Sequence, residues 1–281
     1  MSVLDEPLHF DPAALGAGVR PGKVTLVGAG PGDPELLTVK AARALQCASL
    51  VLYDQLVDPA VLALLPRDAE RIYVGKASGH HSMAQDAIIE LMLGLALAGR
   101  PLLRLKGGDP YIFGRGGEEA QALAAAGVPF EVIPGISAAQ GAAAMAGMPL
   151  THRDHACSLV LTTGHLRQDA HGDAGDRIVD LDWDLLARPR QTVVVYMGVG
   201  TLPIICGKLI EHGLPADTPA ATIERATRPD QRTVVGTVAT LPSLALLHRV
   251  KPPALIMIGG VVSLREQLAP ASSGVRLSAN A

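Results

Sequence analysis

Short apolar runs alternate with longer amphipathic stretches along the first half of the chain. Runs with the length and spacing of strands cover residues 23–30, 49–54, 71–75, 101–109 and 129–135. Stretches with the spacing of helices cover residues 34–46 and 83–99. Because strands and helices take turns in this way, the pattern predicts a parallel sheet whose crossovers are right-handed.

The alternation resumes in the second half with a different character. Further apolar runs cover residues 158–165, 191–198, 202–213, 220–227, 232–241 and 253–262. Several of them are rich in threonine and valine, which indicates strands that include antiparallel pairs. Between the two halves, an alanine-rich helix is expected to start near Ser137 and to run to Ala146. It is followed by "GMPLTHRDH", a connector suited to a domain boundary.

The chain of 281 residues could form one large α/β domain or two smaller ones, and the change of pattern favours two. We expect an α/β fold with an N-terminal domain over residues 21–136 and a C-terminal domain over residues 137–268. Residues 1–20 are expected to form a flexible leader and residues 269–281 a disordered tail. The polar, glycine-bearing segment 168–182 is expected to be a surface loop.

Composition and charge narrow the classes of function. The formal net charge is -3, so the chain lacks the basic field of a nucleic-acid coat protein, and an anionic ligand would need a local cluster of cations. Cys47, Cys157 and Cys206 are far apart and form no CxxC pair, which argues against a disulfide framework and favours a reducing cytoplasm. The uncharged stretch 132–151 is rich in alanine and glycine and contains "PG", so it predicts a buried helix rather than a membrane span.

Two glycine-rich loops follow predicted strands and carry the candidate chemistry. The first runs from Gly28 to Pro34 with G-x-G-x-G spacing, and Asp33 stands where a dinucleotide fingerprint would have its third glycine. The second runs from Lys106 to Glu119, "KGGDPYIFGRGGEE". Each contains an aspartate, which favours a cationic ligand over a phosphate. Both are expected at the carboxyl ends of parallel strands, where open α/β sheets bind ligands.

Nine segments occur in a fixed order over residues 24–262: "VGAGPGDPELLT", "YDQLV", "YVGK", "LRLKGGDPYIFGRGGEE", "VIPGISAA", "PLTHRD", "TGH", "YMG" and "KPPALIMIGGVV". Together they resemble the uroporphyrinogen-III C-methyltransferases, which belong to the class III, tetrapyrrole-methylase group of SAM-dependent enzymes. "FGRGGEE" and "PLTHRD" are the segments most particular to that family. The resemblance implies a parallel sheet in the first domain, a mixed sheet in the second, SAM in the cleft between them, and a homodimer.

The activity that the resemblance implies is a methyl transfer from SAM, with S-adenosyl-L-homocysteine (SAH) as the second product. The methyl groups go to C2 and then C7 of uroporphyrinogen III, giving precorrin-2 through precorrin-1 on a route to sirohaem, cobalamin or haem d1. The chain has no room for the dehydrogenase and ferrochelatase module of some relatives, so a stand-alone methyltransferase is expected. Reduced pyrrole carbons are electron-rich, so alignment and proton management are sufficient and no metal is needed.

The cofactor contacts that the resemblance implies fall in both predicted domains. Matched by motif, they are Pro31, Gly107, Gly108, Asp109, Ile112, Ser137, Ala138, Met197, Ala226, Thr227, Pro253 and Ala254. Two of them depart from the family pattern. Ser137 replaces a threonine and keeps its hydroxyl, whereas Ala226 replaces a glycine and adds a methyl group near the cofactor.

The tetrapyrrole substrate carries many carboxylates, so its site requires local cations. Arg115 in "FGRGGEE" matches the family arginine that is credited with substrate binding and proton abstraction. Because a guanidinium is a poor base, we favour binding of a carboxylate or of the transition state. Glu118 would lie near Arg115 and could orient it or accept a pyrrole N–H. Alternatively, Glu118 and Glu119 merely complement the amino end of a helix.

Other polar residues are assigned to the site by the resemblance. Asp54 and Lys76 end predicted strands and would have acid–base roles, although an aspartate at a strand end is also often a helix cap. The further substrate contacts expected are Arg153, His165, Lys106 and Met197. The plain structural alternatives are a surface ion pair for Arg153, a core histidine for His165 and a core methionine for Met197.

Three other functions are alternatives for this sequence. A sister methylase could act on a later corrin intermediate, an RNA or a protein, but "FGRGGEE" and "PLTHRD" argue against it. A nucleotide-dependent dehydrogenase is disfavoured by Asp33, and a non-catalytic tetrapyrrole carrier would show no turnover with SAM. Two histidine pairs, His80 with His81 and His152 with His155, lack further ligands at a supporting spacing, so no metal site is expected.

Overall fold

The chain forms two compact units, residues 1–137 and 138–281, each with its own core. The computed structural model describes residues 20–75, 83–165, 167–168, 177–269 and 276–277. The leader expected over 1–20 and the tail expected over 269–281 therefore lie almost wholly outside the described residues. Most of the loop expected over 168–182 does so too.

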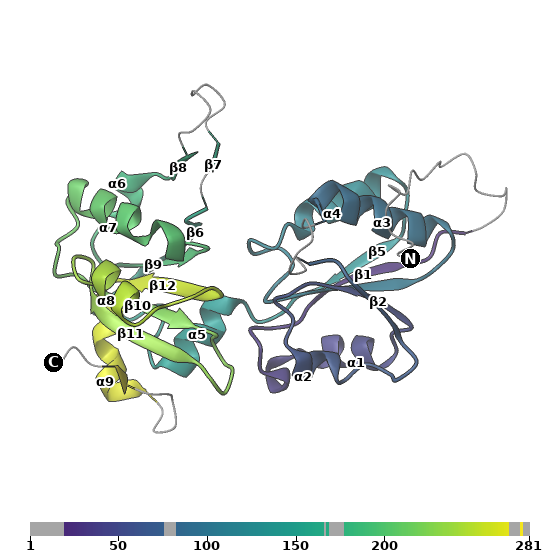
Figure 1. Ribbon diagram of the computed structural model, residues 1–281, viewed down its shortest axis with the longest axis horizontal. Coiled ribbons are helices and arrows are strands. Elements are labelled where there is room, and N and C mark those ends of the chain that lie inside the picture. The colour runs from purple at the N-terminus through teal and green to yellow at the C-terminus, as the bar shows by residue number, and fades with distance from the viewer. Residues whose placement is uncertain (1–19, 76–82, 166, 169–176, 270–275, 278–281) are drawn as a thin grey trace. The chain divides into compact units, whose positions relative to one another are not determined.

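Unit 1 contains a five-stranded sheet with helices on both faces (Figure 1). The strand order is β3-β2-β4-β1-β5, and every strand pair is parallel, which confirms the predicted parallel sheet. The strands are β1 Val24–Gly28, β2 Leu50–Tyr53, β3 Glu70–Tyr73, β4 Leu102–Lys106 and β5 Phe130–Ile133. The helices are η2 Pro34–Leu36, α1 Val39–Gln46, α2 Pro59–Leu62, α3 Gln85–Leu97 and α4 Gly116–Ala125.

The helix expected over residues 34–46 is divided into η2 and α1 by two capping side chains. Asp33 accepts a hydrogen bond from the backbone N–H of Glu35 (2.9 Å) and so caps η2. Thr38 accepts one from the N–H of Ala41 (3.1 Å) and caps α1. Each cap satisfies an amide that has no partner within its helix. The carboxylate of Asp33 thus serves the backbone of the first glycine loop.

The core of unit 1 lies on both faces of its sheet. Helices α3 and α4 cover one face, where Leu26 and Leu52 are buried, and α1 and α2 cover the other, where Leu105 is buried. Side chains of a strand alternate between the faces. Leu102 of β4 belongs to the α3 and α4 side, so the polar residues at alternating positions of this strand point the same way.

The centre of the unit 1 sheet is a topological switch point. Strands β1 and β4 are neighbours, and the helix that follows β1 packs on the opposite face from the helix that follows β4. Doubly wound sheets open a crevice for a ligand outside the carboxyl ends of such a strand pair. The two glycine loops follow these two strands, as their sequence position predicted.

Unit 2 contains a mixed six-stranded sheet of order β13-β11-β10-β12-β9-β6, which confirms the predicted antiparallel pairs. Its strands are β6 Ser158–Thr163, β9 Gln191–Tyr196, β10 Pro219–Glu224, β11 Arg232–Thr237, β12 Ala254–Ile258 and β13 Arg276–Leu277. A small separate ladder joins β7 Arg167–Gln168 to β8 Arg177–Ile178. The helices are α5 Ala138–Ala146, α6 Trp183–Leu186, η3 Val199–Thr201, α7 Leu202–Glu211, α8 Leu241–Leu247, η4 Gly260–Leu264 and α9 Arg265–Leu268.

The helices of unit 2 lie on both faces of its sheet. Helix α5 and the 3-10 helix η4 pack on one face, and α6, α7 and α8 on the other. The buried Arg265 donates a hydrogen bond to the carbonyl of Ala146 at the end of α5. Because the last carbonyls of a helix have no partner within it, this bond fastens α5 at its carboxyl end.

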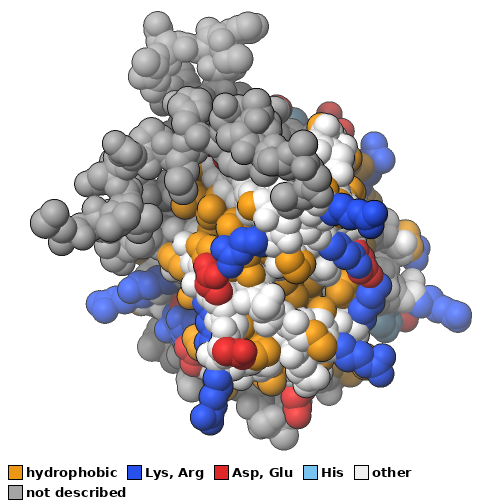
Figure 2. Space-filling view, turned by 90° about the vertical axis from the view of Figure 1, so that its right-hand side faces the viewer, with side chains coloured by type: hydrophobic (Ala, Val, Ile, Leu, Met, Phe, Trp, Pro, Cys, Tyr) orange, Lys and Arg blue, Asp and Glu red, His pale blue; other side chains and the backbone are white. Residues whose placement is uncertain are grey.

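The described surface mixes charged and apolar side chains. Figure 2 shows one face on which lysine and arginine side chains lie mostly around the margin, with hydrophobic side chains spread between polar ones. Exposed ion pairs such as Arg100 with Glu70 contribute little stability each. None of the helices in the described ranges combines the length and the apolar character that a membrane crossing requires.

Candidate functional site

The two glycine loops of unit 1 are joined backbone to backbone. The N–H of Gly108 donates to the carbonyl of Gly30 (2.7 Å), and the N–H of Gly30 donates to the carbonyl of Gly108 (3.2 Å). A Cβ atom built on Gly28 would lie 2.5 Å from the nitrogen of Gly135 and 2.7 Å from the oxygen of Gly108. These glycines are therefore needed for the close approach of three backbone segments.

Asp109 fastens the second glycine loop. One carboxylate oxygen accepts a hydrogen bond from the N–H of Tyr111 (2.8 Å) and the other accepts one from the N–H of Gly135 (3.0 Å). The aspartate therefore fixes the loop after β4 to the segment after β5. Its direct contact with the cofactor stays a prediction.

The second loop reaches α4 through a strained backbone. Phe113 and Arg115 have positive φ angles of 52° and 57°, a conformation that is costly for residues other than glycine. The N–H of Gly116 donates to the carbonyl of Pro110 (2.9 Å), and a Cβ on Gly116 would lie 2.4 Å from that same oxygen. Strain of this kind persists where the surrounding structure holds it and often marks functional sites.

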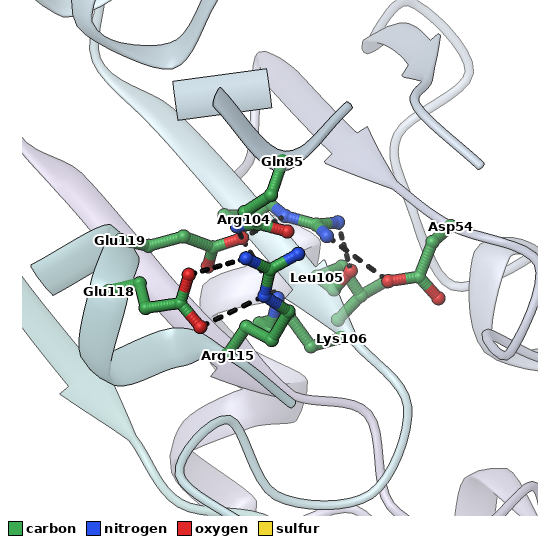
Figure 3. Close-up of polar contacts among 8 residues, drawn as sticks. All are labelled: Asp54, Gln85, Arg104, Leu105, Lys106, Arg115, Glu118 and Glu119. Carbon is green, nitrogen blue, oxygen red and sulfur yellow. Dashed lines mark hydrogen bonds and ion pairs between the residues drawn. The ribbon is translucent and has the colours of Figure 1, made fainter. Parts of the chain in front are cut away.

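Arg115 and Glu118 form an exposed bidentate ion pair at the start of α4 (Figure 3). The Nε of Arg115 donates to Oε1 of Glu118 (2.9 Å) and its Nη2 donates to Oε2 (2.6 Å). The hydrogen bond from Arg115 lowers the pKa of Glu118, and the same bond raises the pKa of Arg115. Arg115 is thus a permanent cation in this state. It is suited to hold a carboxylate and poorly suited to accept a proton.

The next residue of α4, Glu119, belongs to a buried polar cluster (Figure 3). Oε1 of the fully buried Glu119 accepts hydrogen bonds from Lys106 Nζ (2.9 Å), Arg104 Nε (3.2 Å) and Gln85 Nε2 (3.2 Å). Burial lowers the pKa of Lys106, and the neighbouring charge of Arg104 lowers it further, against the opposing effect of Glu119. Lys106 therefore lies within a buried ion network, and its role in substrate binding stays a prediction.

Asp54 is held at the edge of this cluster. It follows β2, and its Oδ1 accepts a hydrogen bond from the N–H of Leu56 (3.0 Å) while its Oδ2 accepts one from Arg104 (3.1 Å). The first bond closes a local turn and does not cap a helix, because the N-cap of α2 is Asp58. The second bond joins Asp54 to the interior. Lys76, expected to work with Asp54, lies outside the described residues, as do His80 and His81.

Sequence reasoning missed Arg104 and gave Glu119 only a role at the helix end. The signal for Arg104 was present: in "PLLRLKGGD" an arginine and a lysine alternate with leucines, so both must face the same side of a buried strand. Burial of Glu119, which precedes an alanine-rich stretch on α4, could not be read from its spacing.

Of the remaining unit 1 positions, Pro31, Gly107 and Ile112 lie on the two glycine loops, and Ser137 lies in the segment after β5. Pro31 and Ile112 are half-buried, and Ser137 is buried at the end of the unit. Gly107 has room for no side chain, because a Cβ there would lie 2.7 Å from the Cβ of Leu56. Their contacts with SAM stay predictions.

In unit 2 the strand directions bring the expected cofactor and substrate positions to one sheet edge. Because β12 is antiparallel to both β9 and β10, its amino end lies beside their carboxyl ends. Three expected groups are therefore neighbours along that edge: Met197 follows β9, Ala226 and Thr227 follow β10, and Pro253 directly precedes β12, whose first residue is Ala254. His165 joins them, since β6 runs parallel to β9.

Backbone strain and hydrogen bonds shape this edge. Met197 is 54% exposed with a φ of 54°, and Thr227 has a φ of 67°. The side-chain hydroxyl of Tyr196 accepts a hydrogen bond from the N–H of Ala139 (3.0 Å), which ties the start of α5, and with it Ala138, to the end of β9. Ala226 has no positive φ, so the alanine at this position meets no conformational penalty.

Arg153 lies apart from this group within unit 2. It sits in the turn between His152 and Ala156, and its carbonyl accepts a hydrogen bond from Arg190, just before β9 begins (3.2 Å). This is the end of β9 opposite to Met197. The rings of His152 and His155 are neighbours, but the described residues contain no group of three or more ligands arranged to hold a metal ion.

Comparisons with known proteins agree with this architecture. The model of the tetrapyrrole (corrin/porphyrin) methylases matches residues 23–242. The chain is 55% identical to the siroheme synthase of Gluconacetobacter diazotrophicus over 253 residues, which are 90% of this chain and 52% of that protein. It is 54% identical to the siroheme synthase of Nitrosospira multiformis over 248 residues, which are 88% and 51%. The chain thus spans about half the length of these curated relatives.

Solved structures show the same likeness. The native uroporphyrin III C-methyl transferase of Thermus thermophilus is 43% identical and superposes with a TM-score of 0.71, covering 86% of this chain and 100% of that one. Its complex with S-adenosyl homocysteine gives a TM-score of 0.72 at 43% identity, with the same coverage. The family model spans most of the chain, and the parallel and mixed sheets match its members. The chain therefore belongs to the tetrapyrrole methylase family.

Proposed function

We propose that this chain is a SAM-dependent C-methyltransferase that converts uroporphyrinogen III into precorrin-2 by methylating C2 and then C7. The observation that carries the proposal is the likeness to the Thermus thermophilus enzyme along all of that enzyme's length. The exposed, bidentate Arg115–Glu118 pair within "FGRGGEE" supports it, since the substrate's carboxylates require a cation at the mouth of the site.

The three backbone segments at Gly28, Gly108 and Gly135, which we call the glycine cradle, fit SAM as the cofactor. Backbone segments at Gly28, Gly108 and Gly135 approach so closely that a Cβ on either Gly28 or Gly135 would strike the others. The segment at Gly28 ends β1 and the other two follow β4 and β5, so all three lie at the carboxyl ends of the parallel strands, where open α/β sheets bind their ligands. When bound, SAM supplies an electrophilic methyl group on its sulfonium, and the residues of this chain do the remaining work.

That work consists of binding, orientation and proton transfer. Arg115 holds a substrate carboxylate and thereby turns the reacting carbon toward the cofactor. Methylation of a ring carbon leaves a proton to be removed, and Asp54 is the carboxylate that we assign to accept it. Each of its oxygens accepts one hydrogen bond and keeps a further lone pair.

The proposal is tested by anaerobic turnover with a panel of acceptors. Purified protein is incubated with SAM and either uroporphyrinogen III or a later corrin intermediate, and the release of SAH is measured. We expect SAH release with uroporphyrinogen III. If the protein binds SAH and forms it from SAM with a corrin intermediate but not with uroporphyrinogen III, the protein would be reassigned to a sister methylase.

We further propose that the protein acts as a homodimer in the cytoplasm, as the family resemblance implies. Light scattering after size-exclusion chromatography tests the dimer, and a mass equal to one chain would contradict it. The thiols of Cys47, Cys157 and Cys206 are unpaired in the structure, which is compatible with a reducing compartment.

A further inference from the structure

Arg104 occupies a position of the central sheet where the neighbouring strands carry apolar side chains. Its register partners are Leu26 on β1 and Leu52 on β2, and both leucines are fully buried. Arg104 itself is only 2% exposed. A leucine or isoleucine would continue this core layer at a much smaller desolvation cost.

The guanidinium of Arg104 joins the interior to the ligand-binding edge of the sheet. Its Nε donates to Glu119 (3.2 Å), its Nη1 to the carbonyl of Leu105 (3.0 Å) and its Nη2 to Asp54 (3.1 Å). Figure 3 shows Arg104 between Glu119 on one side and Asp54 on the other. The planar fork of an arginine fixes the relative direction of the groups that it binds.

Stability alone does not account for this arrangement. One oxygen of Glu119 accepts three hydrogen bonds, whereas its buried Oε2 has no hydrogen-bond partner in the part of the chain that the structure describes. A network selected for stability would satisfy both oxygens, because a buried acceptor without a partner is costly. A buried ion network is weak evidence for stability, so the geometry of this one calls for another explanation.

Asp54 depends on Arg104 for its orientation. The other bond to its carboxylate comes from the N–H of Leu56, two residues away, which fixes one oxygen in a local turn. Asp54 is partly exposed, with a side-chain accessibility of 23%, against 3% for the Arg104 side chain. The partly exposed carboxylate is therefore held from within by a rigid cation that is itself anchored on α4.

We propose that Arg104 is a positioning residue, with Glu119 as its buried anchor, that fixes the Asp54 carboxylate for the proton transfer of the methylation reaction. This inference rests on the proposed function, because it assigns Arg104 a role only through Asp54. Because Arg104 is buried, it acts through Asp54 and not by binding the substrate. Its removal should therefore lower turnover and leave cofactor binding intact.

A double-mutant cycle tests the inference in the full-length chain. Arg104→Gln, Asp54→Ala and the combined variant are compared for kcat, KM and SAH affinity with uroporphyrinogen III as acceptor. We expect Arg104→Gln to lower kcat about 10- to 100-fold, the loss that corresponds to a charge-assisted hydrogen bond. Asp54→Ala should lower kcat by about 100- to 10,000-fold, because it removes the proton acceptor. The combined variant should be no slower than Asp54→Ala, since an arginine with no carboxylate to hold has nothing to contribute. KM and SAH affinity should stay near wild type in Arg104→Gln.

Arg100→Gln is the matched control, because it makes the same chemical change in unit 1 at an exposed pair with Glu70. It should leave kcat unchanged. Multiplicative losses in the combined Arg104 and Asp54 variant, or a wild-type kcat in Arg104→Gln, would overturn the positioning role while leaving the proposed function standing. A wild-type protein that forms no methylated product would instead remove the proposed function, and the positioning role with it.

A second variant guards against loss of folding. Arg104→Lys keeps the positive charge but cannot bridge both carboxylates, so it should fold and show a kcat between those of wild type and Arg104→Gln. If neither variant folds, the arginine serves the stability of unit 1 and the proposal is overturned.

Discussion

Replacing Arg115 by alanine separates substrate binding from both folding and cofactor binding. The side chain is 54% exposed and donates to both oxygens of Glu118, at 2.9 and 2.6 Å. The hydrogen bond with Glu118 raises its pKa, so the group remains a cation and its contribution is that of a charge. The proposed function gives this charge to a substrate carboxylate.

The structure sets the expected magnitudes. An exposed ion pair contributes less than about 1 kcal/mol, so Arg115→Ala should change the free energy of unfolding by no more than that. Loss of a charge-assisted hydrogen bond to substrate costs about 1.5 to 3 kcal/mol, which corresponds to a fall of roughly 10- to 150-fold in kcat/KM. SAH affinity should stay near wild type, since the glycine cradle is untouched.

The assay combines initial rates of SAH release, calorimetric titration with SAH and denaturant unfolding. Arg115→Gly is the matched variant, because the backbone here has a φ of 57° that glycine adopts without strain. It should be as inactive as Arg115→Ala and more stable than it by about 1 kcal/mol. A wild-type kcat/KM in Arg115→Ala would refute the substrate role. A loss of SAH affinity as large as the loss of turnover would refute the separation of the two sites.

Three further predictions concern packing, acid stability and thiol reactivity. In Gly135→Ala the new Cβ would lie 2.3 Å from the oxygen of Gly108, so the free energy of unfolding should fall by about 1 to 3 kcal/mol and SAH affinity should fall with it. Gly117→Ala is the control, because its Cβ meets open space. Wild-type SAH binding in Gly135→Ala would mean that the glycine cradle has only a structural role. Hydrogen bonds from two lysines lower the pKa of Glu131 from 4.5 to about 2, so its contribution to stability is present above pH 4.5 and is lost as the pH falls toward 2. Unfolding curves of Glu131→Gln should therefore lose less stability over that range than wild type, and parallel profiles would contradict the ion pairs. Burial raises the pKa of the Cys206 thiol to about 12, so mass spectrometry after treatment of the native protein with a maleimide near neutral pH should find this thiol unlabelled, and rapid labelling would contradict its burial.

The fold was predictable because its hydrophobic pattern is local. Each parallel strand of unit 1 comes from a short apolar run, and these runs reappear as β1 to β5, with the two glycine loops after β1 and β4. The helix boundary at residues 34–46 was missed, because the capping action of Thr38 interrupts a stretch whose apolar spacing looks continuous. A cap acts through one hydrogen bond and leaves the periodicity unchanged.

The site was predictable only where its residues are neighbours in sequence. Arg115 and Glu118 are three residues apart on one helix end, so their pairing follows from spacing. The contact of Arg104 with Asp54 joins residues that are 50 positions apart, and it depends on the β2-β4 pairing, which no local pattern encodes. Arg153 lies near one end of β9 and Met197 at the other, a separation that their motifs could not reveal.

The proposed double methylation is tested most directly by a mass-resolved time course of the anaerobic reaction with uroporphyrinogen III and SAM. We expect a product with one added methyl group to form first and then to be converted into a product with two, with one SAH released per methyl group transferred. SAH binding in the absence of any methylated tetrapyrrole would contradict it.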